Sequence, residues 1–175
     1  MDLAYIYFTL SSAFNAVVIT ILGALVFIQN RKSYENKIFI LFCAAVAFWA
    51  YAYIFWPLAR TSEGTLLSFQ LLHIGACYVF ILYLHFTVIW LNIYKIKKVQ
   101  IYFGYIVATI FSLSVFSTNF ISGMAPKFSM RYWAEPGILY HLYLVMFFGF
   151  VFYSSLLSYY NNSLISFIIF SSISK

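Results

Sequence analysis

Three histidines, His73, His85 and His141, are the residues of this chain best suited to chemistry. An imidazole can bind a metal ion, transfer a proton or hydrogen-bond to a neighbour. His73 and His85 are 12 residues apart, which on one helix separates them by about 120° around the axis and about 18 Å along it. They cannot share one ligand, so we expect neither a metal nor another cofactor. We predict that the histidines hydrogen-bond between helices, with a sensing role as the alternative.

His85 lies within the apolar stretch "FILYLHFTVIWLNIYKIKKV", which closes with three lysines. The residues on its helical face are apolar apart from Tyr78. An imidazole turned towards lipid would therefore have no hydrogen-bond partner in hydrocarbon. We expect His85 to turn inward and to hydrogen-bond to a neighbouring helix near the end that the lysines mark.

The acidic residues are too few and too peripheral for most catalytic or transport chemistry. They lie at the chain terminus or between apolar stretches, at Asp2, Glu35, Glu63 and Glu135. A proton relay or a cation pathway needs a carboxylate inside the membrane, and the motifs H-E-x-x-H and G-x-S-x-G are also absent from the sequence. We therefore expect no enzyme in this chain, and ion-coupled transport is disfavoured.

Trp49 joins the histidines as a candidate interhelical or sensing residue. It lies near the middle of an apolar stretch, where its indole N–H has no water and needs a partner in the bundle. Other aromatic residues near the ends of such stretches, among them Trp56, Trp90 and Trp133, are expected in interfacial belts. Cys43 and Cys77 fall at different depths, so we expect two free thiols packed as small apolar groups.

The elements that position these side chains are transmembrane helices. Hydrophobic residues make up 65% of the chain and charged residues 8%, and a helix needs roughly 20 apolar residues to cross a bilayer. The sequence predicts an all-α, polytopic transmembrane helical bundle with five full spans. These cover residues 3–28, 38–59, 65–91, 99–121 and 138–160. The charged breaks between them, including a longer segment 122–137, are expected to be turns at a membrane face.

Lysines and arginines set the orientation. One face of the membrane would hold seven basic residues and the other face Arg60, Lys127 and Arg131. The seven are Lys175 and the predicted cytoplasmic anchors Arg31, Lys32, Lys37, Lys95, Lys97 and Lys98. This asymmetry predicts a multi-pass protein of the plasma membrane with its N-terminus outside. The net charge of +6 then reflects topology and attraction to lipid headgroups, not binding to nucleic acid.

Three segments carry a family resemblance. "NKIFILFCAAVAFWAYAYIFWPLA" has an asparagine before a helix, then Phe39 and Trp49; "HIGACYVFILYLHFTVIWL" contains a Leu-His-Phe triplet around His85; and Pro136–Gly137 precedes the last predicted span. Together they resemble the N-terminal seven-helix sensor region of bacterial and archaeal histidine kinases, over about residues 30–160. The resemblance implies signal sensing ahead of a cytoplasmic output module.

The end of the chain departs from that pattern. After Tyr160 a short sixth apolar segment spans about 15 Å as a helix, too little to cross a bilayer. We therefore expect a sensor-like domain over residues 1–160 and a truncated tail over 161–175, without helices six and seven and without an output kinase or cyclase. The chain is then a fragment of a sensor, or a stand-alone module that signals by docking to a partner.

The sequence as a whole favours a membrane-embedded input module of two-component signal transduction. The alternatives are a small transporter or channel subunit, which needs a polar pathway that the sequence offers only in scattered groups, and a structural accessory membrane protein. The expected partners are the lipid bilayer and a cytoplasmic output domain or partner protein, with a homodimer left open.

Overall fold

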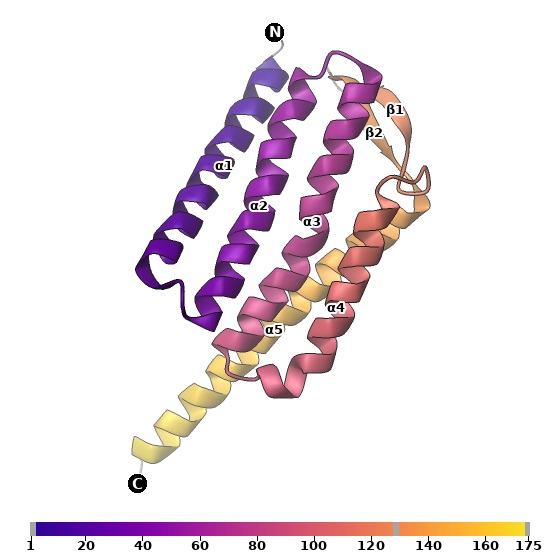
Figure 1. The fold of residues 1–175 in the computed structure, drawn as a ribbon. Helices are drawn as coiled ribbons and strands as arrows, with labels where there is room; N and C mark the ends of the chain where they lie inside the picture. The colour runs from indigo at the N-terminus through magenta and orange to yellow at the C-terminus, as the bar shows by residue number, and fades with distance from the viewer. Residues whose placement is uncertain (1–2, 128–129, 174–175) are drawn as a thin grey trace.

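The computed structural model describes residues 3–127 and 130–173, without the side chains of residue 4 and of residues 162–173. Five helices and a two-stranded sheet make up this part of the chain (Figure 1). The elements are α1 (Leu3–Asn30), α2 (Tyr34–Leu58), α3 (Ser62–Trp90), α4 (Tyr94–Ser114), β1 (Ile121–Lys127), β2 (Met130–Pro136) and α5 (Ile138–Ile173). All five helices are long and apolar enough to cross a membrane, which confirms the predicted helical bundle.

Helices α1 to α4 lie side by side in chain order, and α5 crosses behind α3 and α4 (Figure 1). Helix α3 occupies the centre, because it packs against α2, α4 and α5. It is also the most buried helix, with 72% of its most apolar 18 residues buried. Its side chains Phe80, Ile81 and Leu84 are fully buried. A displacement of α3 therefore affects three other helices at once.

The first turns of α2 and α3 include polar residues that precede the apolar runs of these helices. Ser33 caps α2 by accepting a hydrogen bond from the Asn36 backbone N–H, and Thr61 caps α3 by accepting one from Gly64. Such caps satisfy N–H groups that the first turn leaves free. Each of these two helices consequently begins a few residues before the predicted start.

The predicted start of α4 at residue 99 is wrong. Asn92 adopts a φ of 57°, a left-handed conformation that asparagine tolerates, and the chain then enters α4 at Tyr94. Lys95, Lys97 and Lys98 therefore lie in the first turns of α4 and not in a break between helices. The helix also ends earlier than predicted, at Ser114.

The segment 122–137, predicted to be a turn region, contains an antiparallel hairpin. Strands β1 and β2 pair Gly123 with Glu135, Met124 with Ala134 and Ala125 with Trp133. The register shifts between Ala125 and Lys127, next to Pro126, because proline has no N–H to offer to a ladder. The hairpin lies at the same end of the bundle as the start of α1 (Figure 1).

The short apolar segment after Tyr160 continues α5 without a break, since this helix extends to Ile173. The membrane-spanning part of α5 among the described residues covers Ile138–Asn161. The proposed division between a sensor domain and a tail at residue 160 remains a prediction.

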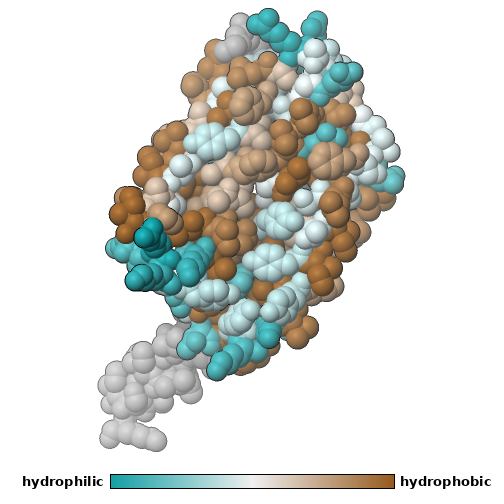
Figure 2. Space-filling model, in the orientation of Figure 1, coloured by the Kyte–Doolittle hydropathy of each residue, from teal (hydrophilic) through white to brown (hydrophobic). Residues whose placement is uncertain are grey.

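The outer surface of the bundle suits contact with lipid. Exposed apolar side chains run along the helices, for example Phe14 on α1, Ile110 on α4 and Phe152 on α5. Figure 2 shows this apolar surface in brown, with hydrophilic residues in teal gathered at the two ends of the molecule. A charged end at each side of an apolar band is the pattern of a polytopic membrane protein.

Candidate functional site

A cavity of about 550 Å³ opens between α2, α3 and α5 beneath the hairpin. Its volume lies in the range of small-molecule sites, roughly 300–1,000 Å³. Most of its lining is apolar and aromatic, with a few polar groups. The aromatic side chains of the lining are Trp49, Tyr53, Phe69, Phe120, Trp133, Tyr140, Tyr143, Phe147 and Phe148.

His73 contributes an imidazole to this cavity from α3. Its Nδ1 lies 2.7 Å from the carbonyl oxygen of Phe69, one turn earlier on the same helix. The ring also packs edge-on against Phe120 and Tyr140, with centroids 5.4 and 5.3 Å away. The expected hydrogen bond between helices is thus wrong for His73, because its own helix supplies the acceptor.

Because a carbonyl oxygen can only accept, His73 Nδ1 carries the proton and donates it to Phe69. In the neutral ring Nε2 is then an acceptor. Within the described residues no donor hydrogen-bonds to this atom, and the His73 side chain lines the cavity. Nε2 therefore remains available to a molecule in the cavity.

Trp49 lines the same cavity from α2. Its ring packs edge-on against Tyr53 at a centroid distance of 5.9 Å. The expected hydrogen bond of its indole N–H to another helix is not formed within the described part of the chain. Trp49 and His73, which the sequence could only name separately, face one shared space.

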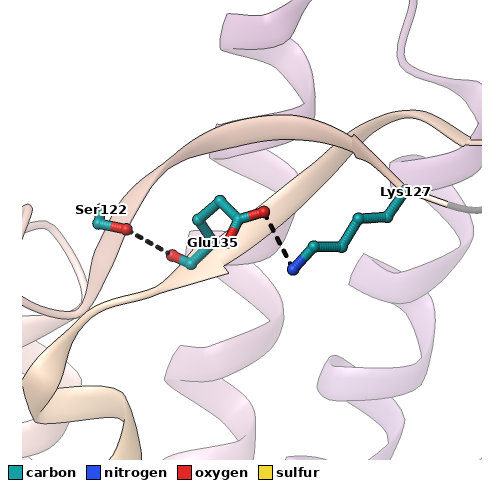
Figure 3. A network of polar contacts seen from close by, with 3 residues as sticks. All are labelled: Ser122, Lys127 and Glu135. Atoms are coloured by element: carbon teal, nitrogen blue, oxygen red, sulfur yellow. Dashed lines mark hydrogen bonds and ion pairs between the residues drawn. The ribbon is translucent and has the colours of Figure 1, made fainter.

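The hairpin brings a charged pair to the edge of the cavity. Lys127 Nζ lies 3.0 Å from Glu135 Oε1, and Ser122 donates to the backbone carbonyl of Glu135 at 3.2 Å (Figure 3). Lys127 and Glu135 both line the cavity, and their side chains are 40% and 35% exposed. The pair brings no net charge to the site.

Trp56 holds the hairpin on the helices. Its Nε1–H donates to the carbonyl oxygen of Tyr132 on β2 at 3.2 Å, and its ring packs edge-on against Trp133 with centroids 4.9 Å apart. Only 2% of Trp56 is exposed. The expectation that this residue belongs to an interfacial belt is therefore wrong, because the hairpin covers it.

His85 lies near the other end of α3 and contacts two neighbouring helices. Its Nδ1 lies 2.9 Å from the Tyr105 hydroxyl on α4, and its Nε2 lies 3.4 Å from the Tyr34 hydroxyl on α2. Tyr94 stacks on the ring at 5.5 Å. A neutral imidazole has one donor and one acceptor, and the two hydroxyls can satisfy both. The name tyrosine–histidine cluster is used below for Tyr34, His85, Tyr94 and Tyr105.

His141 lies apart from both of these places. It is exposed on α5, and its Nδ1 lies 2.9 Å from the carbonyl oxygen of Gly137 in the turn before. The predicted interhelical hydrogen bond is therefore wrong for this residue too. Among the described residues no group of three or more histidine, cysteine or acidic side chains could hold a metal ion. Cys43 and Cys77 are buried free thiols, as predicted.

The six predicted cytoplasmic anchors gather at the end of the bundle opposite the hairpin. Arg31 and Lys32 lie between α1 and α2, and the three lysines of α4 follow the turn after α3 (Figure 1). Two of these lysines lie over aromatic rings, Lys97 over Tyr153 at 5.5 Å and Lys98 over Tyr102 at 5.7 Å. Lys175, counted in the predicted asymmetry, lies outside the described residues.

Comparisons with known proteins agree with the resemblance in the motifs. The family model for the N-terminal 7TM region of histidine kinase matches residues 12–170. No curated protein and no solved structure matches the chain.

Proposed function

Because this chain belongs to the family of N-terminal 7TM regions of histidine kinases, we propose that it is a membrane-embedded input module whose α3 helix passes a change at the cavity to the tyrosine–histidine cluster. The observation that carries the proposal is the placement of His73 and His85 on one central helix. His73 lines the cavity and His85 contacts the helices at the opposite end. The two are about 18 Å apart along α3.

A packed helix can transmit such a change as a small shift or rotation. α3 is in contact with α2 and α5 around the cavity and with α4 beyond it. Because interhelical packing is close, a shift of α3 at the cavity alters its contacts further along. The hydrogen bond between His85 and Tyr105 would convey that shift to α4.

A signal can move the equilibrium only if it binds one packing arrangement better than the other. The cavity could bind a signal differently in the two arrangements, because its walls belong to three helices and the hairpin. An occupant that favours one spacing of α2, α3 and α5 stabilises the arrangement with that spacing.

The proposed orientation gives the coupling a direction. The seven-to-three excess of basic residues favours the hairpin outside and the start of α4 inside the cell. The cavity then opens near the outer face and the tyrosine–histidine cluster lies near the cytoplasmic face. The chain itself is proposed to do no chemistry and to act on a cytoplasmic output, as a linked domain or as a partner protein.

A chimera tests this function. Residues 1–175 are placed ahead of a histidine-kinase output, and phosphotransfer is measured in membranes for the native sequence, for His85→Phe and for His141→Phe. His85→Phe should change kinase output at equal membrane yield, whereas His141→Phe, an identical substitution outside the cluster, should not. Equal output from all three, together with equal output from cavity variants, would reject the input-module proposal.

A further inference from the structure

The cavity beneath the hairpin has features that restrict the chemistry of its occupant. Its lining is mostly apolar and rich in aromatic rings, its two charged residues are paired with each other, and one imidazole nitrogen lacks a donor within the described residues. We propose that it binds a small, uncharged aromatic molecule with one hydroxyl group, whose O–H donates to His73 Nε2. The inference deepens the proposed function by naming the chemical class of the signal.

The aromatic character of the ligand follows from the walls. Trp49 and Tyr53 face the cavity from α2, and Tyr140, Tyr143 and Phe147 face it from α5. Aromatic rings prefer offset or edge-to-face contact with other rings, and the edge-on pair of Trp49 and Tyr53 already shows this geometry. A planar ring system would therefore make contacts on both sides that a flexible aliphatic chain would not.

The hydroxyl follows from the tautomer of His73. Nδ1 is committed to the Phe69 carbonyl at 2.7 Å, so Nε2 presents a lone pair and selects a donor. A ligand with only acceptor groups, such as an ether or a ketone, would leave this lone pair unpaired and would bring a second acceptor close to it. A buried polar group without a partner is unfavourable.

The lack of charge follows from the hairpin. Lys127 and Glu135 form an ion pair with 3.0 Å between the charged atoms. An anionic ligand would have to compete with Glu135 for Lys127, and a cationic one with Lys127 for Glu135. Apart from His73 and the hydroxyls of Tyr53, Tyr140 and Tyr143, the remaining lining is apolar. These neutral groups would not compensate for burying a charge.

The cavity volume of about 550 Å³ accommodates a molecule of two rings. We therefore choose 4-hydroxybiphenyl as the probe and biphenyl, which lacks the hydroxyl group, as the matched control compound. Binding is measured by equilibrium dialysis between lipid nanodiscs that contain the chain and empty nanodiscs of the same lipid, so that partition into the bilayer cancels.

Wild-type chain should bind 4-hydroxybiphenyl about fivefold more tightly than biphenyl, the ratio that one net hydrogen bond supplies. His73→Phe should bind the two molecules equally, and His141→Phe should keep the preference of the wild type. Val46→Phe, which adds a ring at the cavity wall, should weaken binding of both and keep their ratio. This variant tests the location of the probe even where His73→Phe lowers the folded yield.

Three results would overturn the inference. Equal affinity of the wild type for both molecules would show that the ligand's hydroxyl group contributes nothing to binding. Affinities unchanged by Val46→Phe would place the probe elsewhere on the chain. Absence of saturable binding would leave the cavity to a lipid chain or to another helix. Each of these results can occur while His85→Phe still alters kinase output, so failure of the ligand inference is distinguishable from failure of the proposed function.

Discussion

The Nδ1 atom of His85 lies 2.9 Å from the hydroxyl oxygen of Tyr105, and this hydrogen bond joins α3 to α4. It is one of the side-chain hydrogen bonds between helices, which also include Tyr78 with Thr109 and Thr20 with Tyr51. The His85 ring contacts hydroxyls on two of the helices that pack against α3, Tyr105 on α4 and Tyr34 on α2. The imidazole of His85 therefore links α3 to both α2 and α4 at this end of the bundle.

His85→Phe should lower the stability of the bundle by about 1 kcal/mol, the scale of interhelical hydrogen bonds in membranes. Tyr105→Phe should cost a similar amount, because it removes the other partner of the shorter bond. The double variant should cost clearly less than the two single changes added together, since both remove the same interaction. Thermal unfolding in detergent measures all three.

The matched control for this cycle is His141→Phe. This side chain is exposed, and among the described residues it hydrogen-bonds only to the carbonyl of Gly137 just before its helix. Its replacement should therefore leave the midpoint of unfolding close to that of the wild type. Additive effects of His85→Phe and Tyr105→Phe would show that the two residues are energetically independent.

Trp56→Phe should loosen the hairpin. The substitution keeps an aromatic ring but removes the N–H that donates to the Tyr132 carbonyl, and a lost hydrogen bond of this kind costs about 1 kcal/mol. Trp90→Phe is the control, because Trp90 is 72% exposed. Hydrogen exchange of the β1 and β2 amides should rise in the first variant and stay unchanged in the second. Equal exchange in both would mean that other contacts hold the hairpin.

Gly75→Val should disrupt the packing of α2 against α3. A Cβ atom at Gly75 would lie 3.0 Å from both the Ala45 carbonyl oxygen and the Trp49 backbone nitrogen, and backbone atoms of a packed helix cannot move aside independently. Close approach through small residues is a common basis of helix packing in membranes. The folded yield and the unfolding midpoint should both fall.

Gly149→Val provides the comparison for Gly75→Val. Nothing lies within 4 Å of a Cβ atom at this glycine of α5, so the same substitution should be neutral or slightly stabilising, since glycine is a poor helix former. Equal loss of yield in both variants would point to a general effect of valine and not to contact between α2 and α3.

A single cysteine introduced at Ser62 should react with a membrane-impermeant maleimide on intact cells, whereas one at Ser33 should react only after permeabilisation. The two residues lie at opposite ends of the bundle, Ser62 at the start of α3 and Ser33 in the turn before α2. The unmodified chain is the control, because Cys43 and Cys77 are buried. The opposite labelling pattern would invert the proposed orientation.

The number of predicted spans agrees with the structure, although the bounds of α4 do not, because spanning a bilayer is a local property of the sequence. A run of apolar residues must form a helix in hydrocarbon, where every backbone N–H and C=O needs a partner within the segment. Capping side chains such as Ser33 and Thr61 extended the helices beyond the apolar runs. Family membership was also accessible, because the motifs around Trp49, His85 and Gly137 can be read along the chain.

The histidines show where local reasoning was insufficient. His73 and His141 hydrogen-bond to the carbonyl four residues earlier, an acceptor that every helix offers and that competes with a neighbouring helix. His85 contacts other helices because Tyr105 and Tyr34 happen to reach it. Which of these outcomes holds depends on the rotation of each helix about its axis, which a helix that is apolar on all sides does not encode.

The sequence alone determined that this is a bundle of membrane-spanning helices of a sensor family. Hydrophobic runs, basic residues and short motifs each involve residues close together in the sequence, so they can be recognised without the structure. Only the tertiary structure decided that residues 121–127 and 130–136 pair as strands, that Trp56 is covered by them, and that Trp49 and His73 face one cavity with Tyr140. The physical reason is that strand pairing and cavity walls join residues distant in sequence, and their contact energies arise only when α2, α3, α5 and the hairpin meet.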